Sequence, residues 1–479
     1  MRAFVRDLET QVVLCDDDGT RAALSARTLE RMGYTNVQVL EGGLDAWQAA
    51  GQVLEWGSNV PSKDFGERVQ MEQAVPEVTP RELADRQARG EAIMLLDART
   101  PEEHEVSCIP GSRSMPTVEL ALRAGSVAEP GATIVVHCAG RTRSIIGAQT
   151  LRRMGYRNVS ALKNGTMGWV LDGLTPETGS TRVALPLPAE VPADRARTLA
   201  LEDGVRFIPW SDVAQAPSPA LAGGGARPAL SGNVYLIDVR TREEYLGGHI
   251  PGFQWVPGGQ AIQRADEIIG VRAGHIVFTC DGVVRAAITG SWFRQMGFPN
   301  VSVLEGGTAG WQGPLERGVP HEEPFGYQEA APVAPQLSPE AAAEAVKGNP
   351  RPLVLFVDTS REYAAGHLAG SFWLPRGWLE LRVAEVARDH HDPVLVTSAD
   401  GANAVLAAAT LVELGYRDVS VLEGGIRAWR AAGLPLEEGF QNLLASTNDF
   451  VRAGTERSRE EMVHYLEWEE ALGEKYRRI

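Results

Sequence analysis

Short runs of consecutive apolar residues alternate along this chain with segments in which apolar positions recur every three or four residues. Three such runs, at residues 92–98, 133–138 and 158–162, show no regular alternation with polar residues ("AIMLLDA", "TIVVHC" and "NVSAL"). Runs of this kind are typical of strands in a parallel sheet that is covered on both faces. Residues 144–154, "SIIGAQTLRRM", have helical periodicity instead. The alternation predicts an α/β fold in which right-handed strand-helix-strand crossovers build a parallel sheet flanked by helices.

Start and stop signals of helices lie at the expected places in this pattern. Thr79 is followed by Pro80 and by Glu82, which is typical of a capped helix start, and Gly90 marks the end of that helix. Ser338-Pro339 opens the equivalent helix later in the chain. These signals predict helices that alternate with the apolar runs.

The pattern is repeated four times. Each copy contains a Gly and a Trp that are 14 positions apart in closely similar segments, ending at Trp47, Trp169, Trp311 and Trp429. An upstream block recurs in three copies, around Asp97, Asp238 and Asp358. Because 479 residues exceed what one hydrophobic core usually organises, we interpret the repeats as tandem domains.

The domain limits follow from the repeats and from Pro-rich linkers between them. We predict a partial unit at 1–55, full units at 74–180, 196–320 and 334–440, and a helical tail at 441–479. The first unit lacks the upstream block and is therefore truncated on its N-terminal side. Either the protein starts further upstream or a neighbouring unit completes this half-domain.

Two segments fall outside the repeat pattern. Residues 215–232, rich in Pro, Gly and Ala, are predicted to form a surface loop inserted in the third unit. The charged C-terminal helix carries an apolar stripe, and we expect this stripe to dock on the core of the protein. Its members are Met462, Tyr465, Leu466, Trp468 and Leu472.

Composition and charge exclude several classes of function. The chain has a formal net charge of −16, which repels nucleic acid and anionic membrane surfaces. No run of about 18 apolar residues and no signal peptide is present, so we predict a cytoplasmic protein. The four cysteines are scattered and form no CxxC pair, which argues against a disulfide framework or a zinc site. No metal or cofactor is predicted.

One cysteine lies where chemistry is expected. In open parallel sheets, ligands collect at the carboxyl ends of strands, where a following helix offers free amides and a positive dipole end. Cys138 stands at such a junction, in "HCAGRTRS". The dipole together with Arg141 and Arg143 is expected to favour the nucleophilic thiolate. The small residues Ala139 and Gly140 allow successive amides to surround the sulfur.

These residues resemble the rhodanese superfamily. The resemblance rests on "LLDART…CIPGS", "CAGRTR" and "VSALKNG…GW", and it covers nearly all of the chain in four copies. It implies a sulfurtransferase without a cofactor that moves sulfane sulfur from a small donor, with thiosulfate as the first choice, to a thiol or cyanide acceptor. The oligomeric state is left open, with a homodimer as one option.

The resemblance also assigns roles to individual residues. Cys138 would carry the persulfide, with Asp97 and Arg99 supporting the loop. The residues that would bind the donor are Ala139, Gly140, Arg141, Thr142 and Arg143. The resemblance makes Arg141 the expected contact for an anionic donor, and thiosulfate is the first choice because two arginines suit a dianion.

The four loops align as residues 16–21, 138–143, 280–285 and 398–403. Asp16 and Ser398 stand at the cysteine position of the first and fourth units, which are therefore predicted to be non-catalytic. The third unit keeps Cys280 and Arg285 and is weighed as a second catalytic site. Its Asp281, directly after the cysteine, opposes a thiolate.

Other polar residues beside these motifs are assigned structural roles. His137 is predicted to be a packed strand residue. Cys108 stands where the third and fourth units have His249 and His367, and we interpret it as a structural substitution. The pair Glu102–Glu103 is expected to be a solvated helix start.

Two other classes of function use related features. A cysteine-dependent phosphatase or arsenate reductase needs five residues between Cys and Arg to surround a tetrahedral oxyanion, whereas four separate Cys138 from Arg143. A non-catalytic interaction scaffold would agree with the two loops that lack cysteine. The intact loop at Cys138 favours the sulfurtransferase.

Overall fold

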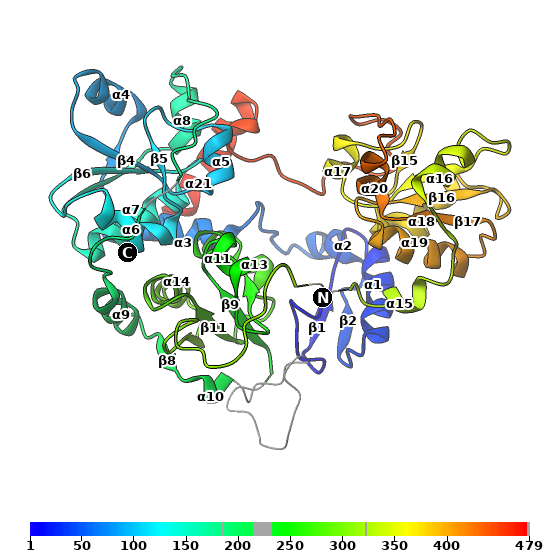
Figure 1. The fold of residues 1–479 in the computed structure, drawn as a ribbon, viewed down its shortest axis with the longest axis horizontal. Helices are drawn as coiled ribbons and strands as arrows, with labels where there is room; N and C mark the ends of the chain where they lie inside the picture. The colour runs from blue at the N-terminus through cyan, green and yellow to red at the C-terminus, as the bar shows by residue number, and fades with distance from the viewer. Residues whose placement is uncertain (184–185, 214–231, 321–322, 477–479) are drawn as a thin grey trace. The chain divides into compact units, whose positions relative to one another are not determined.

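The computed structural model describes residues 1–183, 186–213, 232–320 and 323–476 (Figure 1). Within them it contains three five-stranded sheets and one two-stranded sheet, and all strand pairs of these sheets are parallel. This confirms the predicted fold class of repeated α/β units. Most of the predicted insertion at 215–232 lies outside the described residues. Among the described helices, none is both long and apolar enough to cross a membrane.

The chain divides into two compact units. The first comprises residues 1–10, 55–320 and 452–479, and the second comprises residues 11–54 and 321–451. The second and third repeats and the C-terminal tail therefore share one unit, whereas the first and fourth repeats share the other.

The second repeat is a complete sheet with the strand order β3-β7-β6-β4-β5. Its central strand β6 precedes Cys138. The strands are β3 (Glu77–Val78), β4 (Ile93–Asp97), β5 (Arg113–Ser114), β6 (Thr133–His137) and β7 (Asn158–Leu162). The helices are α3 (Val60–Gln73), α4 (Pro80–Ala88), α5 (Pro101–Val106), α6 (Thr117–Arg123), α7 (Thr142–Met154) and α8 (Gly165–Leu171). The predicted strands at 92–98, 133–138 and 158–162 are confirmed.

The predicted helix starts are also confirmed. Helix α4 begins at Pro80, and the Thr79 hydroxyl accepts a hydrogen bond from the Glu82 amide at 3.2 Å. Helix α16 of the fourth repeat begins at Pro339, with the Ser338 hydroxyl accepting from the Ala341 amide. These bonds satisfy amides that have no partner inside the helix.

The third repeat has the equivalent strand order β8-β12-β11-β9-β10. Its strands are β8 (Arg206–Ile208), β9 (Val234–Asp238), β10 (Gln254–Trp255), β11 (His275–Thr279) and β12 (Val301–Leu304). Its helices are α9 (Ala193–Glu202), α10 (Trp210–Val213), α11 (Arg242–Gly247), α12 (Gly258–Gln263), α13 (Ala265–Ile268) and α14 (Val284–Gln295).

The second and third repeats share one hydrophobic core. Leu120 of α6, Ile146 of α7 and Ile288 of α14 belong to a single buried cluster. Polar contacts cross the same interface, where the Trp292 indole donates to the Thr150 hydroxyl at 3.0 Å. The two repeats therefore fold against each other as one body.

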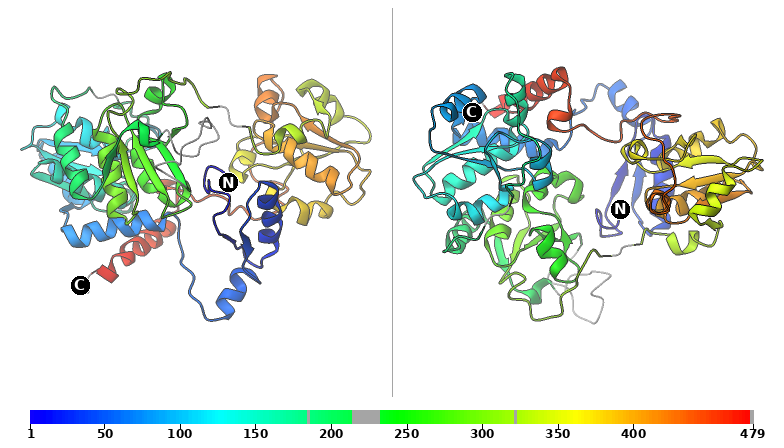
Figure 2. Two further views of the ribbon diagram at one scale, coloured as in Figure 1. Left: turned by 90° about the horizontal axis from the view of Figure 1, so that it is seen from below. Right: turned by 45° about the horizontal axis from the view of Figure 1, so that its top comes forward.

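The C-terminal tail ends in helix α21 (Arg459–Leu472), which lies beside α3 on the second repeat (Figure 2). Met462 and Leu466 are buried and form a cluster with Met167 of α8. Tyr465, Trp468 and Leu472 are half-buried, so the expected docking of the apolar stripe on the core is confirmed.

In the second unit, the fourth repeat has the strand order β13-β17-β16-β14-β15. Its strands are β13 (Gln336–Leu337), β14 (Leu353–Phe356), β15 (Phe372–Trp373), β16 (Val394–Thr397) and β17 (Val419–Leu422). Its helices are α15 (Tyr327–Ala330), α16 (Pro339–Ala345), α17 (Ser360–Ala365), α18 (Leu379–Arg382), α19 (Ala402–Glu413) and α20 (Gly425–Ala431).

The first repeat contributes only two strands and two helices to this unit. They are β1 (Val12–Leu14), β2 (Val37–Val39), α1 (Thr20–Arg31) and α2 (Gly43–Ala49). The strands correspond to the central pair β6 and β7 of the complete sheet. The Arg21 guanidinium lies 4.4 Å from the ring centroid of Trp378 in the fourth repeat, so this half-domain packs on a neighbouring repeat.

Strand register corrects one part of the predicted repeat. Asp97 is paired with His137, and Asp238 is paired with Thr279, but Phe356 takes the equivalent position opposite Thr397. Asp358 lies two residues later, where the second repeat has Arg99. The sequence comparison matched Asp358 with Asp97, but the strand pairing matches Phe356 with Asp97. The upstream block of the fourth repeat is therefore shifted by two positions.

A left-handed turn before α8 fixes the backbone of the loop after β6. Gly165 has φ of 51°, and a Cβ atom there would overlap the carbonyl oxygen of Cys138. The equivalent glycines in the other repeats, Gly43, Gly307 and Gly425, have the same kind of φ and meet the same loop carbonyl. The repeated glycine of the sequence is thus required by this close approach of two backbone segments.

Gly165→Ala should destabilise the protein much more than Gly173→Ala. Gly173 ends the same helix with φ of 80°, but a Cβ atom there meets nothing within 4 Å. The control should lose about 1 kcal/mol from the left-handed φ alone, and Gly165→Ala about 3 kcal/mol because the loop must also move. Urea unfolding of both variants measures this difference, and equal losses would show that the overlap with Cys138 is harmless.

Candidate active site

Cys138 lies at the carboxyl end of the central strand β6, directly before α7. Its carbonyl oxygen accepts a hydrogen bond from the Thr166 amide at 2.9 Å, and the Ala139 carbonyl accepts one from the Met167 amide at 3.0 Å. The first turn of α8 therefore holds the start of the Cys138 loop, which we define as residues 138–143.

The sulfur atom is buried at the start of α7. The Sγ atom of Cys138 lies 3.5 Å from the Ser144 hydroxyl, and the residue as a whole is 2% exposed. Burial raises the pKa of the Cys138 thiol, and the Glu469 carboxylate also raises it, whereas Arg143 and Ser144 act in the opposite direction. The expectation that the loop favours a thiolate is therefore wrong for this closed arrangement.

The loops without cysteine show which groups this turn offers to a side chain. In the fourth repeat, the Ser398 hydroxyl accepts from the amides of Gly401 at 3.0 Å and Ala404 at 3.2 Å. In the first repeat, Asp16 Oδ2 accepts from the Arg21 amide at 2.9 Å. The turn thus directs amides at whatever acceptor its first residue carries.

Arg143 connects the Cys138 loop to helix α5. Its two terminal nitrogens donate to the two carboxylate oxygens of Glu103, both at 2.7 Å. Arg285 and Glu244 form the same pair in the third repeat. Both Glu102 and Glu103 lie in the first turn of α5, and Glu102 is solvated as expected, whereas Glu103 completes the capping box of Thr100 and is half-buried.

Arg141 points away from the thiol into a group of acceptors. Its Nε and Nη2 donate to the Glu67 carboxylate at 2.6 and 3.0 Å, and its Nη1 lies 3.3 Å from Glu77 and 3.2 Å from Glu470. Burial raises the pKa of Glu67 to about 7 despite the arginine. The structure does not bring Arg141 to the sulfur, which counts against its expected contact with a donor.

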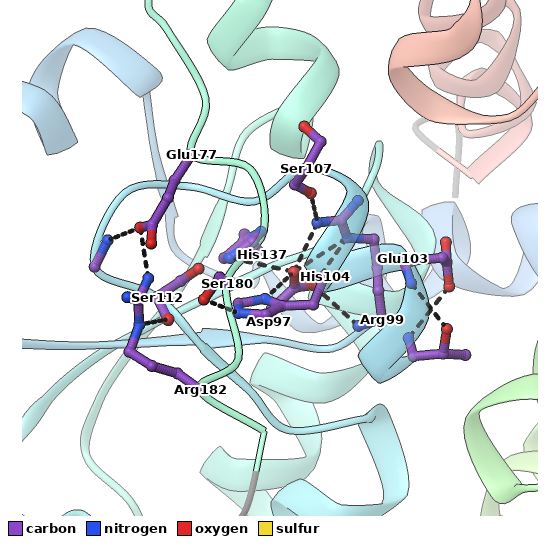
Figure 3. A network of polar contacts seen from close by, with 12 residues as sticks. Asp97, Arg99, Glu103, His104, Ser107, Ser112, His137, Glu177, Ser180 and Arg182 are labelled. Atoms are coloured by element: carbon purple, nitrogen blue, oxygen red, sulfur yellow. Dashed lines mark hydrogen bonds and ion pairs between the residues drawn. The ribbon is translucent and has the colours of Figure 1, made fainter.

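Beneath the loop, Asp97 is the centre of a buried polar network (Figure 3). Arg99 donates to both of its carboxylate oxygens, and His104 Nδ1 lies 2.9 Å from Oδ2. Arg99 also donates to the Ser107 carbonyl, and His104 Nε2 contacts the Ser180 hydroxyl at 3.1 Å. The expected supporting pair of Asp97 and Arg99 is thus assembled, with His104 as a third member.

The histidines of this network differ in charge. The pKa of His104 is raised to about 9, because hydrogen bonds to Asp97 and Cys108 outweigh its burial. The pKa of His137 is lowered to about 4 by burial, and neither of its ring nitrogens has a hydrogen-bond partner among the described residues. His137 is therefore the packed neutral strand residue that the sequence indicates.

Cys108 and His104 replace a stacked pair of the other repeats. There, Tyr245 stacks on His249 and Tyr363 on His367, each with ring centroids 3.8 Å apart. The second repeat has His in place of the Tyr and Cys in place of the His. In the second repeat the imidazole therefore stands four residues earlier in the chain than in the other two repeats. At this earlier position, His104 contacts Asp97.

The C-terminal segment covers the Cys138 loop. Glu469 Oε1 of α21 accepts from the Thr142 hydroxyl at 2.5 Å and from the Thr142 amide at 3.4 Å. A Cβ atom built on Gly140 would lie 3.2 Å from Glu469 Oε2 and 3.6 Å from the Tyr465 ring. The tail therefore seals the face of the loop that the sequence assigns to the donor.

The Cys280 loop differs from the Cys138 loop by an acidic residue directly after the cysteine. Burial and the neighbouring Asp281 raise the pKa of Cys280 to about 12. Arg285 is fully buried and pairs with Asp281, with Glu244 and with Glu119 of the second repeat. Its charge is thus shared among three carboxylates. Across the described residues, no group of three or more His, Cys, Asp or Glu side chains could hold a metal ion.

These features define an α/β protein that holds a thiol in a main-chain loop at the end of a central parallel strand. A model of the rhodanese-like domain matches residues 2–50, 79–172, 226–314 and 338–432, each inside one of the four predicted units. The chain belongs to this family.

Several known relatives are sulfurtransferases. A crystal structure of a thiosulfate sulfurtransferase from Pseudomonas aeruginosa matches with a TM-score of 0.86 and 34% identity, over 100% of this chain and 89% of that chain. The 3-mercaptopyruvate sulfurtransferase of Escherichia coli K12 is 27% identical over 42% of this chain and 87% of its own length. A thiosulfate sulfurtransferase of Actinobacillus pleuropneumoniae is 30% identical over 22% and 94%. These comparisons support an enzyme of the sulfurtransferase class.

Sequence reasoning missed the acidic residues that surround the loop. Glu67 lies in a linker helix outside the repeat, and Glu469 lies in the tail, so no motif connects them to Cys138. Glu103 did carry a signal, because a Glu recurs three positions after a Thr in each complete repeat, at Glu244 and Glu362.

The network around Asp97 predicts a pH-dependent stability. The folded pKa of His104 is about 9 against an ordinary value of 6.5, so its contribution is complete below pH 6.5 and lost as the pH rises through about 9. We expect wild type to lose roughly 2 kcal/mol more than His104→Gln between pH 6.5 and 9.5. Denaturant unfolding and NMR titration of labelled histidines measure this, and a His104 titration near pH 6.5 would contradict it.

Proposed function

We propose that the protein is a sulfurtransferase that carries sulfane sulfur on Cys138, with thiosulfate or a related small molecule as donor. The observation that carries the proposal is the position of Cys138 at the end of the central strand, where the loop and the start of α7 surround its sulfur. A helix N-terminus attracts a donor anion, and at Cys138 the Ser144 amide of α7 opposes the burial that raises the pKa of the thiol.

The reaction takes two nucleophilic steps. The Cys138 thiolate attacks the outer sulfur of thiosulfate, the S–S bond breaks, and sulfite leaves with the electron pair. A thiol or cyanide then attacks the outer sulfur of the resulting persulfide, and the Cys138 thiolate leaves. Each step exchanges one bond to sulfur for another, so no external oxidant, reductant or cofactor takes part.

The donor is proposed from the relatives and no longer from the two arginines. Glu67 and Glu103 neutralise Arg141 and Arg143, so these side chains do not present two free positive charges. Support for thiosulfate comes from the names of the Pseudomonas and Actinobacillus proteins, whereas the Escherichia coli relative is named for 3-mercaptopyruvate. In this proposal Ala139, Gly140 and Thr142 line the donor site.

The remaining loops have other roles. We assign structural functions to the first and fourth repeats, since Asp16 and Ser398 form no persulfide. Cys280 is proposed to be inactive, because Asp281 places a carboxylate directly after it and Arg285 is paired with three carboxylates.

Thiosulfate treatment should add one sulfur atom to the protein, mapped to Cys138 by mass spectrometry. Cys138→Ser should lower the sulfurtransferase rate by at least about 1,000-fold, since a serine hydroxyl cannot replace the thiolate. Cys280→Ser is the matched control and should stay within about twofold of wild type, since Asp281 beside that thiol opposes both a thiolate and an anionic donor. A persulfide on Cys280, or activity that survives Cys138→Ser, would refute this assignment.

A further inference from the structure

The strongest unexplained feature of the site is the Glu469 carboxylate. Glu469 is 1% exposed, and its Oε2 is buried without a hydrogen-bond partner among the described residues. Its Oε1 accepts from the Thr142 hydroxyl and amide, at the start of α7. A carboxylate that uses only half of its acceptors while buried is costly, unless the surrounding site is built for an anion.

The Glu469 carboxylate lies where an anionic ligand would bind, at the start of helix α7. Helix α7 has 13 residues, and Thr142 is its first, so the Thr142 amide is free of helical partners. Oε2 lies against Gly140, on the loop that starts at Cys138, and the Glu469 charge raises the pKa of the Cys138 thiol. A side chain from the tail thus places negative charge where a donor must enter.

We infer that the Thr142 amide and hydroxyl, together with the Gly140 face of the loop, form the anion subsite for the donor, and that Glu469 occupies this subsite as an intramolecular competitor. The inference rests on the proposed function for the identity of the donor, a small anion with a sulfonate or carboxylate group. Glu469 is then the residue that determines how well anions compete with neutral molecules for access to Cys138.

Helix α21 is held over the loop by apolar, polar and ionic contacts. Met462, Leu466 and the half-buried Tyr465 pack around Met167, Val170 and Leu171. Glu470, which is 42% exposed, pairs with the buried Arg141. Displacement of Glu469 by a donor therefore requires the tail helix to move away from the loop against these contacts.

The test compares anionic and neutral reagents of nearly the same size on the full chain. Iodoacetate and iodoacetamide alkylate thiols, and peptide mapping separates Cys138 from the other cysteines. The ratio of the iodoacetate rate to the iodoacetamide rate at Cys138 should rise about tenfold in Glu469→Gln, because the like charge is removed while the hydrogen bonds to Thr142 are kept. Glu469→Ala, which also empties the subsite, should show at least the same rise.

Glu467→Gln is the matched control, since Glu467 lies on the same helix and is exposed. It should leave the ratio unchanged. With thiosulfate, Glu469→Gln should lower KM about tenfold and change kcat little, because one like charge is removed from the donor site. An unchanged reagent ratio in both Glu469 variants would overturn the subsite.

The two readouts separate this inference from the proposed function. A raised reagent ratio in a protein that gains no sulfur from thiosulfate would support the anion subsite and refute thiosulfate transfer. If Cys138 gains sulfur but the ratio of the iodoacetate rate to the iodoacetamide rate is the same in wild type and in both Glu469 variants, the transfer is supported and the anion subsite is overturned.

Discussion

The site depends on the close approach of two backbone segments at the end of the central strand. The carbonyl oxygen of the first loop residue accepts from the amide that directly follows a glycine, and only a glycine fits beside it, as Gly165 does at Cys138. Because this contact is made by the main chain, it is the same in all four repeats whatever side chain the loop carries. The repeats could therefore lose the cysteine and keep the turn.

Charge around the Cys138 loop is almost fully paired inside the protein. Arg141 and Arg143 bind carboxylates from α3 and α5, and Thr142 binds a carboxylate from α21. The positive end of α7 is thus occupied by the protein itself, and the buried thiol has a raised pKa. Side chains from α3, α5 and α21 thus surround the loop that holds the thiol.

The loops with a cysteine and the loops without one lie in different compact units. The second and third repeats share a core and the tail, and this unit holds Cys138 and Cys280. The first and fourth repeats share the other unit, and their loops hold Asp16 and Ser398, which accept loop amides themselves. In the third repeat the thiol survives, but burial and Asp281 raise its pKa, and Arg285, which acts in the opposite direction, is itself paired with Asp281.

The sequence by itself determined the α/β repeats, the strand before Cys138 and the loop that follows it, because these depend on local periodicity, helix caps and a repeated motif. It could not place Glu67 or Glu469, since the linker and the tail reach the loop only after the core has formed. The shift at Asp358 was equally hidden, because strand register is fixed by pairing with β16 and not by the residue type. Only tertiary structure decided that the thiol is covered and that its arginines are already paired, because contacts between distant segments set burial and charge.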